Sequence, residues 1–253
     1  MDKQRLVQTA QALVADKKGI LAADESGGTI KRRFDSINVE STEKTRRDYR
    51  EMLFRTAGVS DFISGVILFD ETIRQEGADG TPLVKVLSDQ GMIPGIKVDK
   101  GTIPLPEAPD ELVTEGLDGL RDRLNEYAEL GAGFTKWRAV IDIADDTPTP
   151  YGLNANAHSL ARFAALSQEA GLVPIVEPEI LRDGGHSIER CFEVTEETLR
   201  EVFDQLAQQK VLLEGMLLKP SMVISGSSAA QRADPAEVAE RTIECFKRVL
   251  PAS

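Results

Sequence analysis

The sequence has few of the residues that mark metal-binding and nucleotide-binding proteins. Its 253 residues include two cysteines, two histidines and one tryptophan. Cys191 and Cys245 lack the spacing of metal ligands, so we expect reduced thiols and no structural zinc site. The first apolar segment ends in the turn DESGG. Because this turn is not the GxGxxG of dinucleotide-binding sheets, a fold of that kind is not favoured.

Positive charge and long apolar runs are also scarce. The chain has 30 Lys and Arg against 42 Asp and Glu, a net charge of −12. This balance argues against general affinity for nucleic acid but leaves open a local basic pocket for a small anion. No apolar run approaches a membrane span, and the N-terminal MDKQRLVQTAQALVAD indicates an amphipathic helix rather than a signal peptide. We therefore expect a cytoplasmic protein without nucleic-acid or membrane partners.

The rest of the composition is that of a soluble globular protein, with 41% hydrophobic and 28% charged residues. The length suffices for one large domain with a substantial core, and no stretch resembles a flexible linker. The sequence therefore predicts a single domain over residues 1–253.

Short apolar segments alternate with helical patterns along this domain, at intervals of about 40 residues. Such an alternation is typical of stacked right-handed β-α units. We count six units, with strands predicted at 19–23, 62–70, 93–101, 134–142, 172–180 and within the apolar segment 211–223. The regular part of the last strand is expected to stop at about Pro220, which cannot donate a ladder hydrogen bond.

Polar residues gather in the carboxyl-terminal halves of these strands. They are Asp24, Lys97, Lys136, Arg138, Glu177, Glu179 and Lys219. A closed parallel barrel brings such strand ends together at the face where these barrels hold their chemistry. An open doubly wound sheet would scatter them along a crevice. The pattern therefore favours an α/β fold of the TIM-type β/α barrel class.

Lys219 lies near the end of VLLEGMLLKPSMV, an almost continuously apolar segment. An ammonium group in a dry strand end loses hydration, which favours the neutral amine, a nucleophile for carbonyl carbon. Repulsion from Lys136, if the two amines lie close together, would act in the same direction. The alternative for this segment alone is an ordinary lysine whose charged end reaches water.

Carboxylates complete the candidate chemistry. Glu177, if it is partly buried among apolar neighbours, could move protons near neutral pH, and Asp24 could remove a proton from a substrate hydroxyl. The alternative is that the carboxylates form structural ion pairs, Glu177 with Lys136 and Glu179 with Arg138.

Positive charge for phosphate groups is predicted at Arg138, Lys97, Arg32 and Arg33, with Ser26 and nearby backbone amides as further donors. Together with the amines and carboxylates, these groups have the parts for Schiff-base chemistry on a phosphorylated sugar.

Six motifs carry a more specific signal: LAADES, GVILFDET, GIKVDKG, FTKWR, VPIVEPEIL and LEGMLLKP. In order and spacing they resemble the successive strand motifs of the class I fructose-1,6-bisphosphate aldolases. The resemblance implies reversible cleavage of fructose 1,6-bisphosphate to dihydroxyacetone phosphate and glyceraldehyde 3-phosphate through a lysine Schiff base. It also implies that neither a metal nor another cofactor is needed.

The same resemblance implies catalytic roles for individual residues. Lys219 would form the imine with the ketose, and Glu177 would assist dehydration of the carbinolamine and later proton transfers. Lys136 would polarise and position the intermediate. Asp24 would act near the hydroxyl whose deprotonation breaks the carbon–carbon bond.

The remaining charged residues are implied in support and binding. Glu179 and Arg138 would support the charge network. Substrate phosphate would be met by Lys97, Ser26 and Arg33.

The sequence departs from the family at its end. The family barrel has eight strands, whereas six units are predicted here, so the domain is expected to be C-terminally incomplete. The SGGQ loop, the YGRALQ segment and the tyrosine-ending tail of the family are not found. Such barrels commonly build their phosphate site after strands seven and eight. Exposed sheet edges predict association, and the family implies a homo-oligomer, a tetramer.

Two other functions stay open. One is a Schiff-base aldolase for another phosphosugar, and the other is a truncated, catalytically incomplete barrel that retains the lysine site. Among residues outside the chemistry, Trp137 is predicted to face the helices, and the acidic run over 111–126 is predicted to be a solvated helix face.

Overall fold

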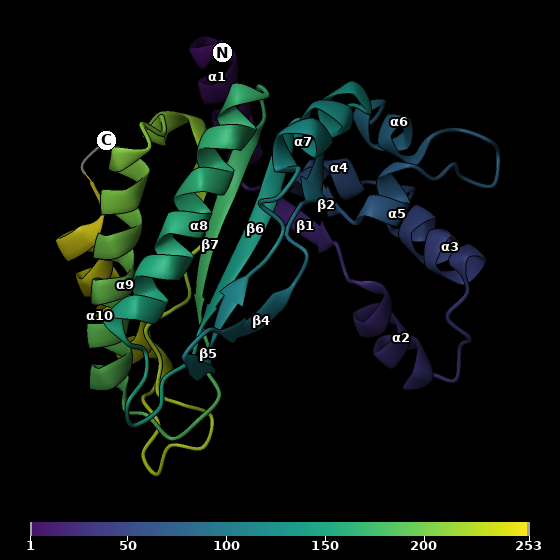
Figure 1. The fold of residues 1–253 in the computed structure, drawn as a ribbon. Coiled ribbons are helices and arrows are strands. Elements are labelled where there is room, and N and C mark those ends of the chain that lie inside the picture. The colour runs from purple at the N-terminus through teal and green to yellow at the C-terminus, as the bar shows by residue number, and fades with distance from the viewer. Residues whose placement is uncertain (1, 252–253) are drawn as a thin grey trace. The chain divides into compact units, whose positions relative to one another are not determined.

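The computed structural model describes residues 2–251, which form two compact units. Unit 1 comprises residues 2–98, 121–136 and 167–174, and unit 2 comprises residues 99–120, 137–166 and 175–251. Strands β6 (Phe134–Ile141) and β7 (Val173–Ile180) begin in unit 1 and end in unit 2. Figure 1 follows the chain by colour from its N-terminus to its C-terminus.

Unit 1 is built on parallel strands in the order β1-β2-β3-β6. Besides β6, these strands are β1 (Gly19–Ala23), β2 (Ile63–Leu68) and β3 (Ile93–Lys97). The helices are α1 (Lys3–Leu13), α2 (Gly27–Asp35), α3 (Glu43–Phe54), α4 (Val59–Phe62), α5 (Asp70–Ile73), α6 (Leu83–Ser88) and most of α7 (Leu120–Glu129). Nearly every residue of β2 is buried, as expected for a parallel strand covered on both faces.

Unit 2 holds the ends of β6 and β7 and strand β8 (Leu217–Leu218), in the order β6-β7-β8. An antiparallel hairpin of β4 (Thr102–Leu105) and β5 (Ala108–Thr114) is visible in Figure 1. The helical elements are most of α8 (Pro150–Glu169), α9 (Ile188–Gln208), the 3-10 helix η1 (Leu213–Gly215) and α10 (Pro235–Val249). Helices α9 and α10 pack on each other and contribute to one hydrophobic core cluster.

Capping residues explain where the longer helices begin. Helix α3 begins after Thr42, whose hydroxyl accepts a hydrogen bond from the Thr45 N–H at 3.1 Å. Helix α9 follows Ser187, and α10 follows Asp234 with a proline at its start. Ser, Thr and Asp satisfy the free N–H groups of a first turn, and proline suits a position that needs no N–H.

The six strands predicted from the sequence are present as β1, β2, β3, β6, β7 and β8, with helices between them. Trp137 is fully buried and stacks on Phe163 of α8 with a centroid distance of 5.6 Å. Its predicted orientation towards the helices is therefore confirmed, as is the α/β organisation with parallel strands.

The strand predicted in the segment 211–223 ends near Pro220 as expected, but it begins much later than the apolar run does. Only β8 is extended in a ladder, and Glu214 and Gly215 belong to η1. A glutamate and a glycine fit a central strand poorly, so the apolar run is interrupted there. The Lys219 N–H still donates to a β7 carbonyl at 2.9 Å, but Pro220 has no N–H and ends the ladder.

The β4–β5 hairpin was missed, and the helix predicted over 111–126 is partly wrong. Residues 111–114 belong to β5, and α7 begins only at Leu120. Gly116 and Gly119 have positive φ angles of 125° and 65°. Left-handed backbone of this kind ends a helical pattern, so the acidic run is divided between a strand, a turn and a helix.

Cys191 and Cys245 are expected to be unreactive in the folded protein. Both are free thiols buried in the core cluster of unit 2. Burial raises the pKa of Cys191 and raises that of Cys245 to about 11. Because the thiolate is the reactive form, a thiol-exchange reagent at pH 8 should label neither side chain until denaturant is added. Rapid reaction of the reagent with the native protein would contradict this prediction.

Gly95 of β3 is expected to tolerate no side chain. A Cβ atom there would fall on the ring of Phe134, its register partner in β6. Gly95→Ala should therefore overpack the sheet and reduce the free energy of unfolding by about 1–3 kcal/mol in a urea titration. Gly19→Ala is the control, because nothing lies within 4 Å of its Cβ position. An equal stability of both variants would show that the ring of Phe134 moves aside without cost.

Candidate active site

In unit 1, Asp24 and Lys136 form a buried ion pair. The Lys136 Nζ donates to a carboxylate oxygen of Asp24 at 2.9 Å, and both residues are buried. Asp24 directly follows β1 and Lys136 lies in β6, so parallel strands fix both backbones. The sequence indicated both residues but not their pairing. The pair holds an amine and a carboxylate together in a place with little water.

Lys97 ends β3 and is the register partner of Lys136 in the β3–β6 ladder. Residues paired in register project to the same face of a sheet. Unit 1 therefore brings two of the predicted amines to one face of its sheet, towards the carboxyl ends of its strands.

Glu25, which no sequence pattern singled out, lies between two arginines. The Arg33 guanidinium of α2 pairs with the Glu25 carboxylate, and the fully buried Arg50 of α3 donates to the Glu25 carbonyl oxygen at 2.7 Å. Ser26 occupies the N-cap position of α2 without a capping hydrogen bond from its side chain, and its hydroxyl lies 3.2 Å from that of Thr29. Two of the predicted phosphate ligands, Ser26 and Arg33, thus belong to the same segment.

Arg50 could have been found from its spacing. It precedes the buried Phe54 of α3 by four residues, and residues at this spacing share a helix face. An arginine on the apolar stripe of a helix is unusual enough to indicate a buried partner.

In unit 2, the Lys219 amine pairs with the Glu177 carboxylate. Glu177 lies in β7 and is 3% exposed, which confirms the predicted burial. The prediction of a dry lysine is wrong, because the Lys219 side chain is 54% exposed. Since β8 ends one residue earlier, the lysine extends from a strand end into water and reaches back to the carboxylate. Its amine is accessible to a substrate carbonyl.

Arg138 and Glu179 form a second ion pair in unit 2, as the structural alternative had allowed. Burial lowers the pKa of Arg138, but the hydrogen bond and attraction of Glu179, with a contribution from Glu177, outweigh burial and raise it overall. The Thr114 hydroxyl donates to the Arg138 carbonyl at 2.7 Å, which ties the hairpin to β6. Unit 2 therefore holds four of the predicted residues in two neighbouring pairs.

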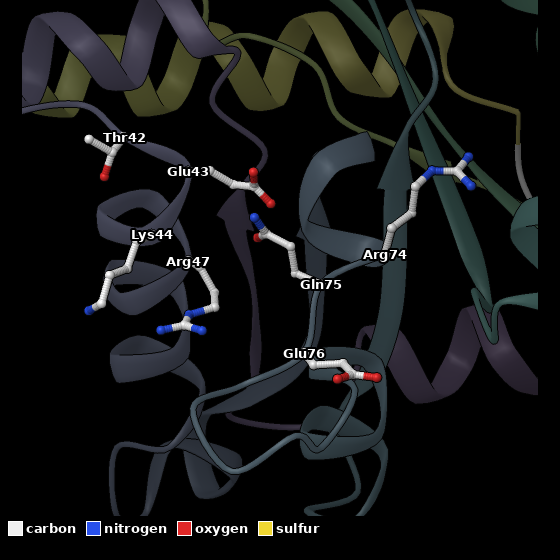
Figure 2. A pocket seen from close by; sticks show the side chains of 7 residues that line it. All are labelled: Thr42, Glu43, Lys44, Arg47, Arg74, Gln75 and Glu76. Atoms are coloured by element: carbon white, nitrogen blue, oxygen red, sulfur yellow. The ribbon is translucent and has the colours of Figure 1, made fainter.

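A separate pocket of about 610 Å³ in unit 1 contains none of the predicted residues. Its lining is Thr42, Glu43, Lys44, Arg47, Arg74, Gln75 and Glu76. Figure 2 shows that the charged ends of Lys44, Arg74 and Glu76 point in different directions. The Lys44 and Arg74 side chains are already paired with carboxylates. This pocket lacks the converging groups of a catalytic site.

The described part of the chain contains neither a cluster of metal-ligating side chains nor a membrane-spanning helix. Within residues 2–251, no three His, Cys, Asp or Glu side chains form a group that could hold a metal ion. No helix of the same residues combines the length and the apolar character of a membrane span.

Parallel strands that end in amines paired with carboxylates are typical of α/β lyases that work through an imine. Comparison with known proteins is more specific. A family model described as fructose-bisphosphate aldolase class-I matches residues 5–253. This chain therefore belongs to the class I fructose-bisphosphate aldolases, which are lyases. The resemblance stated from the motifs is confirmed.

Individual relatives agree. A probable fructose-bisphosphate aldolase class 1 of Xanthomonas campestris is 58% identical over 252 residues, which cover 100% of this chain and 75% of the relative. The cytosolic fructose-bisphosphate aldolase 6 of Arabidopsis thaliana is 51% identical over 248 residues, covering 98% and 69%. A structure of fructose-bisphosphate aldolase from Plasmodium falciparum, in complex with TRAP and a small-molecule inhibitor, matches with a TM-score of 0.96 and 48% identity, covering 98% and 72%.

Proposed function

We propose that this chain catalyses the reversible aldol cleavage of fructose 1,6-bisphosphate to dihydroxyacetone phosphate and glyceraldehyde 3-phosphate. The observation that carries the proposal is the contact of the accessible Lys219 amine with the buried Glu177 carboxylate, in a chain of this family. An accessible amine can attack the ketose carbonyl, and a carboxyl group beside it can manage the protons of that attack.

Lys219 and Glu177 would carry the covalent half of the reaction. The Lys219 ammonium first passes a proton to the Glu177 carboxylate, which leaves a neutral amine. The Lys219 nitrogen then adds to the carbonyl carbon of the ketose, and a proton moves from nitrogen to oxygen to give a carbinolamine. Glu177 then donates a proton to the departing hydroxyl, which leaves as water and yields a protonated imine. This cation accepts the electron pair of the carbon–carbon bond. In other enzymes a metal ion acting as a Lewis acid can stabilise that electron pair instead.

Asp24 and Lys136 would act in the second half of the reaction, in which the carbon–carbon bond breaks. The Asp24 carboxylate removes the proton of the substrate hydroxyl, so that its oxygen forms the aldehyde as the carbon–carbon bond breaks. The electron pair of that bond passes to the imine and gives an enamine on Lys219. Lys136, paired with Asp24, holds the carboxylate in place. Protonation of the enamine and hydrolysis of the imine release dihydroxyacetone phosphate.

The remaining residues would bind and orient. Lys97, Ser26 and Arg33 are proposed to contact the substrate phosphates, since they combine positive charge with a hydroxyl near the start of α2. Arg138 and Glu179, paired with each other, are proposed to maintain the charge balance around Glu177.

The finer architecture also belongs to this proposal. We propose one domain over residues 1–253, with the six parallel strands as six of the eight units of a TIM-type barrel. The high TM-score to the Plasmodium falciparum structure, and the coverage of 72% of that chain, support this. A homotetramer and a cytoplasmic location are proposed as well, the latter supported by the cytosolic Arabidopsis relative.

Borohydride trapping tests the proposal. The chain is incubated with dihydroxyacetone phosphate and borohydride, and the modified peptide is mapped by mass spectrometry beside a cleavage assay on fructose 1,6-bisphosphate. A reduced adduct on Lys219 together with turnover is expected. An adduct on Lys97 or Lys136 instead would overturn the assignment. Turnover of another ketose phosphate, with none of the bisphosphate, would favour a different phosphosugar.

A further inference from the structure

Glu25 occupies an unusual electrostatic position. Its side chain is 7% exposed and touches two guanidinium groups of very different exposure. Arg33 of α2 is 60% exposed and pairs directly with the carboxylate, whereas Arg50 of α3 is fully buried and lies 3.8 Å from its Oε2 atom. A carboxylate with one exposed and one buried cationic partner can change partners.

Arg50 is held firmly from other directions. Its Nη1 donates to the Thr72 hydroxyl at 2.7 Å and its Nη2 to the Glu25 carbonyl at 2.7 Å. A second carboxylate, Glu71, lies 3.7 Å from the Arg50 guanidinium. Both of its oxygens accept hydrogen bonds from the Arg46 guanidinium. Arg50 therefore stays beside Glu25 whatever Arg33 does.

The charges of this cluster balance without Arg33. Glu25 and Glu71 carry two negative charges, and Arg46 and Arg50 carry two positive ones. Departure of Arg33 leaves the buried carboxylate compensated, which avoids the large cost of an uncompensated buried charge. A cavity of about 270 Å³, lined by these four residues among others, gives the Glu25 side chain space to turn towards Arg50.

We propose that Glu25 is a specificity-determining residue that keeps Arg33 occupied until a phosphate dianion displaces it, while Arg50 takes over the released carboxylate. The inference rests on the proposed function, in which Arg33 contacts substrate phosphate. A hydroxyl or a monoanionic group interacts with a guanidinium more weakly than a phosphate dianion does, so it cannot compete with the Glu25 carboxylate. The pair thus selects for phosphorylated ligands.

Phosphate titration of Glu25→Gln tests the exchange. Inorganic phosphate is titrated calorimetrically into the whole chain, and its dissociation constant is expected to fall by about two- to fivefold, because Arg33 no longer has to leave an ion pair. Asp35→Asn is the matched control. It removes a negative charge from the same helix as Arg33, at an exposed pair with Lys31, and should leave the constant unchanged.

A double-mutant cycle with Arg33→Gln separates exchange from simple charge removal. In the Arg33→Gln background, Glu25→Gln should improve phosphate binding much less than in the parent. An equal improvement in both backgrounds would overturn the proposal, as would weaker binding by Glu25→Gln alone, which would mean that Glu25 presents Arg33 to phosphate. If Glu25→Gln does not fold, Glu25→Asp replaces it in the test. The shorter side chain keeps a negative charge near Arg50 but loosens the contact with Arg33. Its dissociation constant for phosphate should therefore also be lower than that of the parent.

Trapping of Lys219 in the same variants distinguishes the two proposals. A Lys219 adduct with dihydroxyacetone phosphate, together with no effect of Glu25→Gln on phosphate, would overturn only the exchange. A folded parent chain that binds phosphate through Arg33 but gives no adduct would instead overturn the proposed function.

Discussion

Lys219→Met is expected to abolish both the borohydride-trapped adduct and turnover of fructose 1,6-bisphosphate. Methionine has a similar length but no amine, so the ketose carbonyl has no nucleophile to add to and no imine forms. Loss of a covalent nucleophile removes a whole mechanism, and kcat should fall by roughly three orders of magnitude or more. Because the Lys219 side chain is 54% exposed, the chain should still fold, although the buried Glu177 carboxylate loses this partner and some stability with it.

Lys136→Met is the matched comparison for this experiment. It keeps Lys219 and the site of attachment, so an adduct should still form, though more slowly. The substitution also removes the Lys136 amine, which donates a hydrogen bond to the buried Asp24 at 2.9 Å. Full trapping by Lys219→Met, at any lysine and at the parent rate, would contradict the assigned role of Lys219.

Arg50→Met is expected to destabilise the fold strongly. Arg50 is fully buried, donates to Thr72 and to the Glu25 carbonyl, and lies within 4 Å of two carboxylates. Removing one partner of such a buried ionic group typically costs about 3–5 kcal/mol, because the remaining charges stay in a poorly hydrated place. For a chain of this size the midpoint of thermal unfolding should fall by roughly 6–20 °C.

Arg121→Met is the control for Arg50→Met. Arg121 pairs with Glu169 at 2.6 Å, but both side chains are more than half exposed. Exposed ion pairs contribute about 0–1 kcal/mol, so calorimetric unfolding of this variant should stay within a few degrees of the parent. Similar melting temperatures for the two variants would show that the Arg50 cluster contributes little to stability.

The pattern of apolar segments predicted the parallel strands well, because a strand covered on both faces needs apolar side chains at consecutive positions. The segment 211–223 shows where this fails, since an apolar run has the same composition whether it forms a strand or, as at Glu214 and Gly215, turns into a 3-10 helix. The hairpin after β3 was missed for a similar reason. Its residues alternate over too short a distance to be told from a loop.

The partners of the candidate catalytic residues could be predicted only in part. Residue type and strand position indicated Asp24, Lys136, Glu177 and Lys219, and the motifs around them indicated the family. The sequence left open whether Glu177 pairs with Lys136, whereas the structure shows Lys136 donating to Asp24 and Lys219 donating to Glu177. It also predicted a dry Lys219, because its apolar neighbours suggested a strand end covered on both faces.

The sequence by itself determined the residue types, their order at the strand ends and the family to which the chain belongs. The tertiary structure alone decided which amine meets which carboxylate, and that Arg50 lies buried against Glu25. The physical reason is that periodicity fixes the face of its own helix or strand on which a side chain lies. Contact with another element depends on register and packing between residues far apart in the chain, such as Arg50 and Glu25, and no local pattern records it.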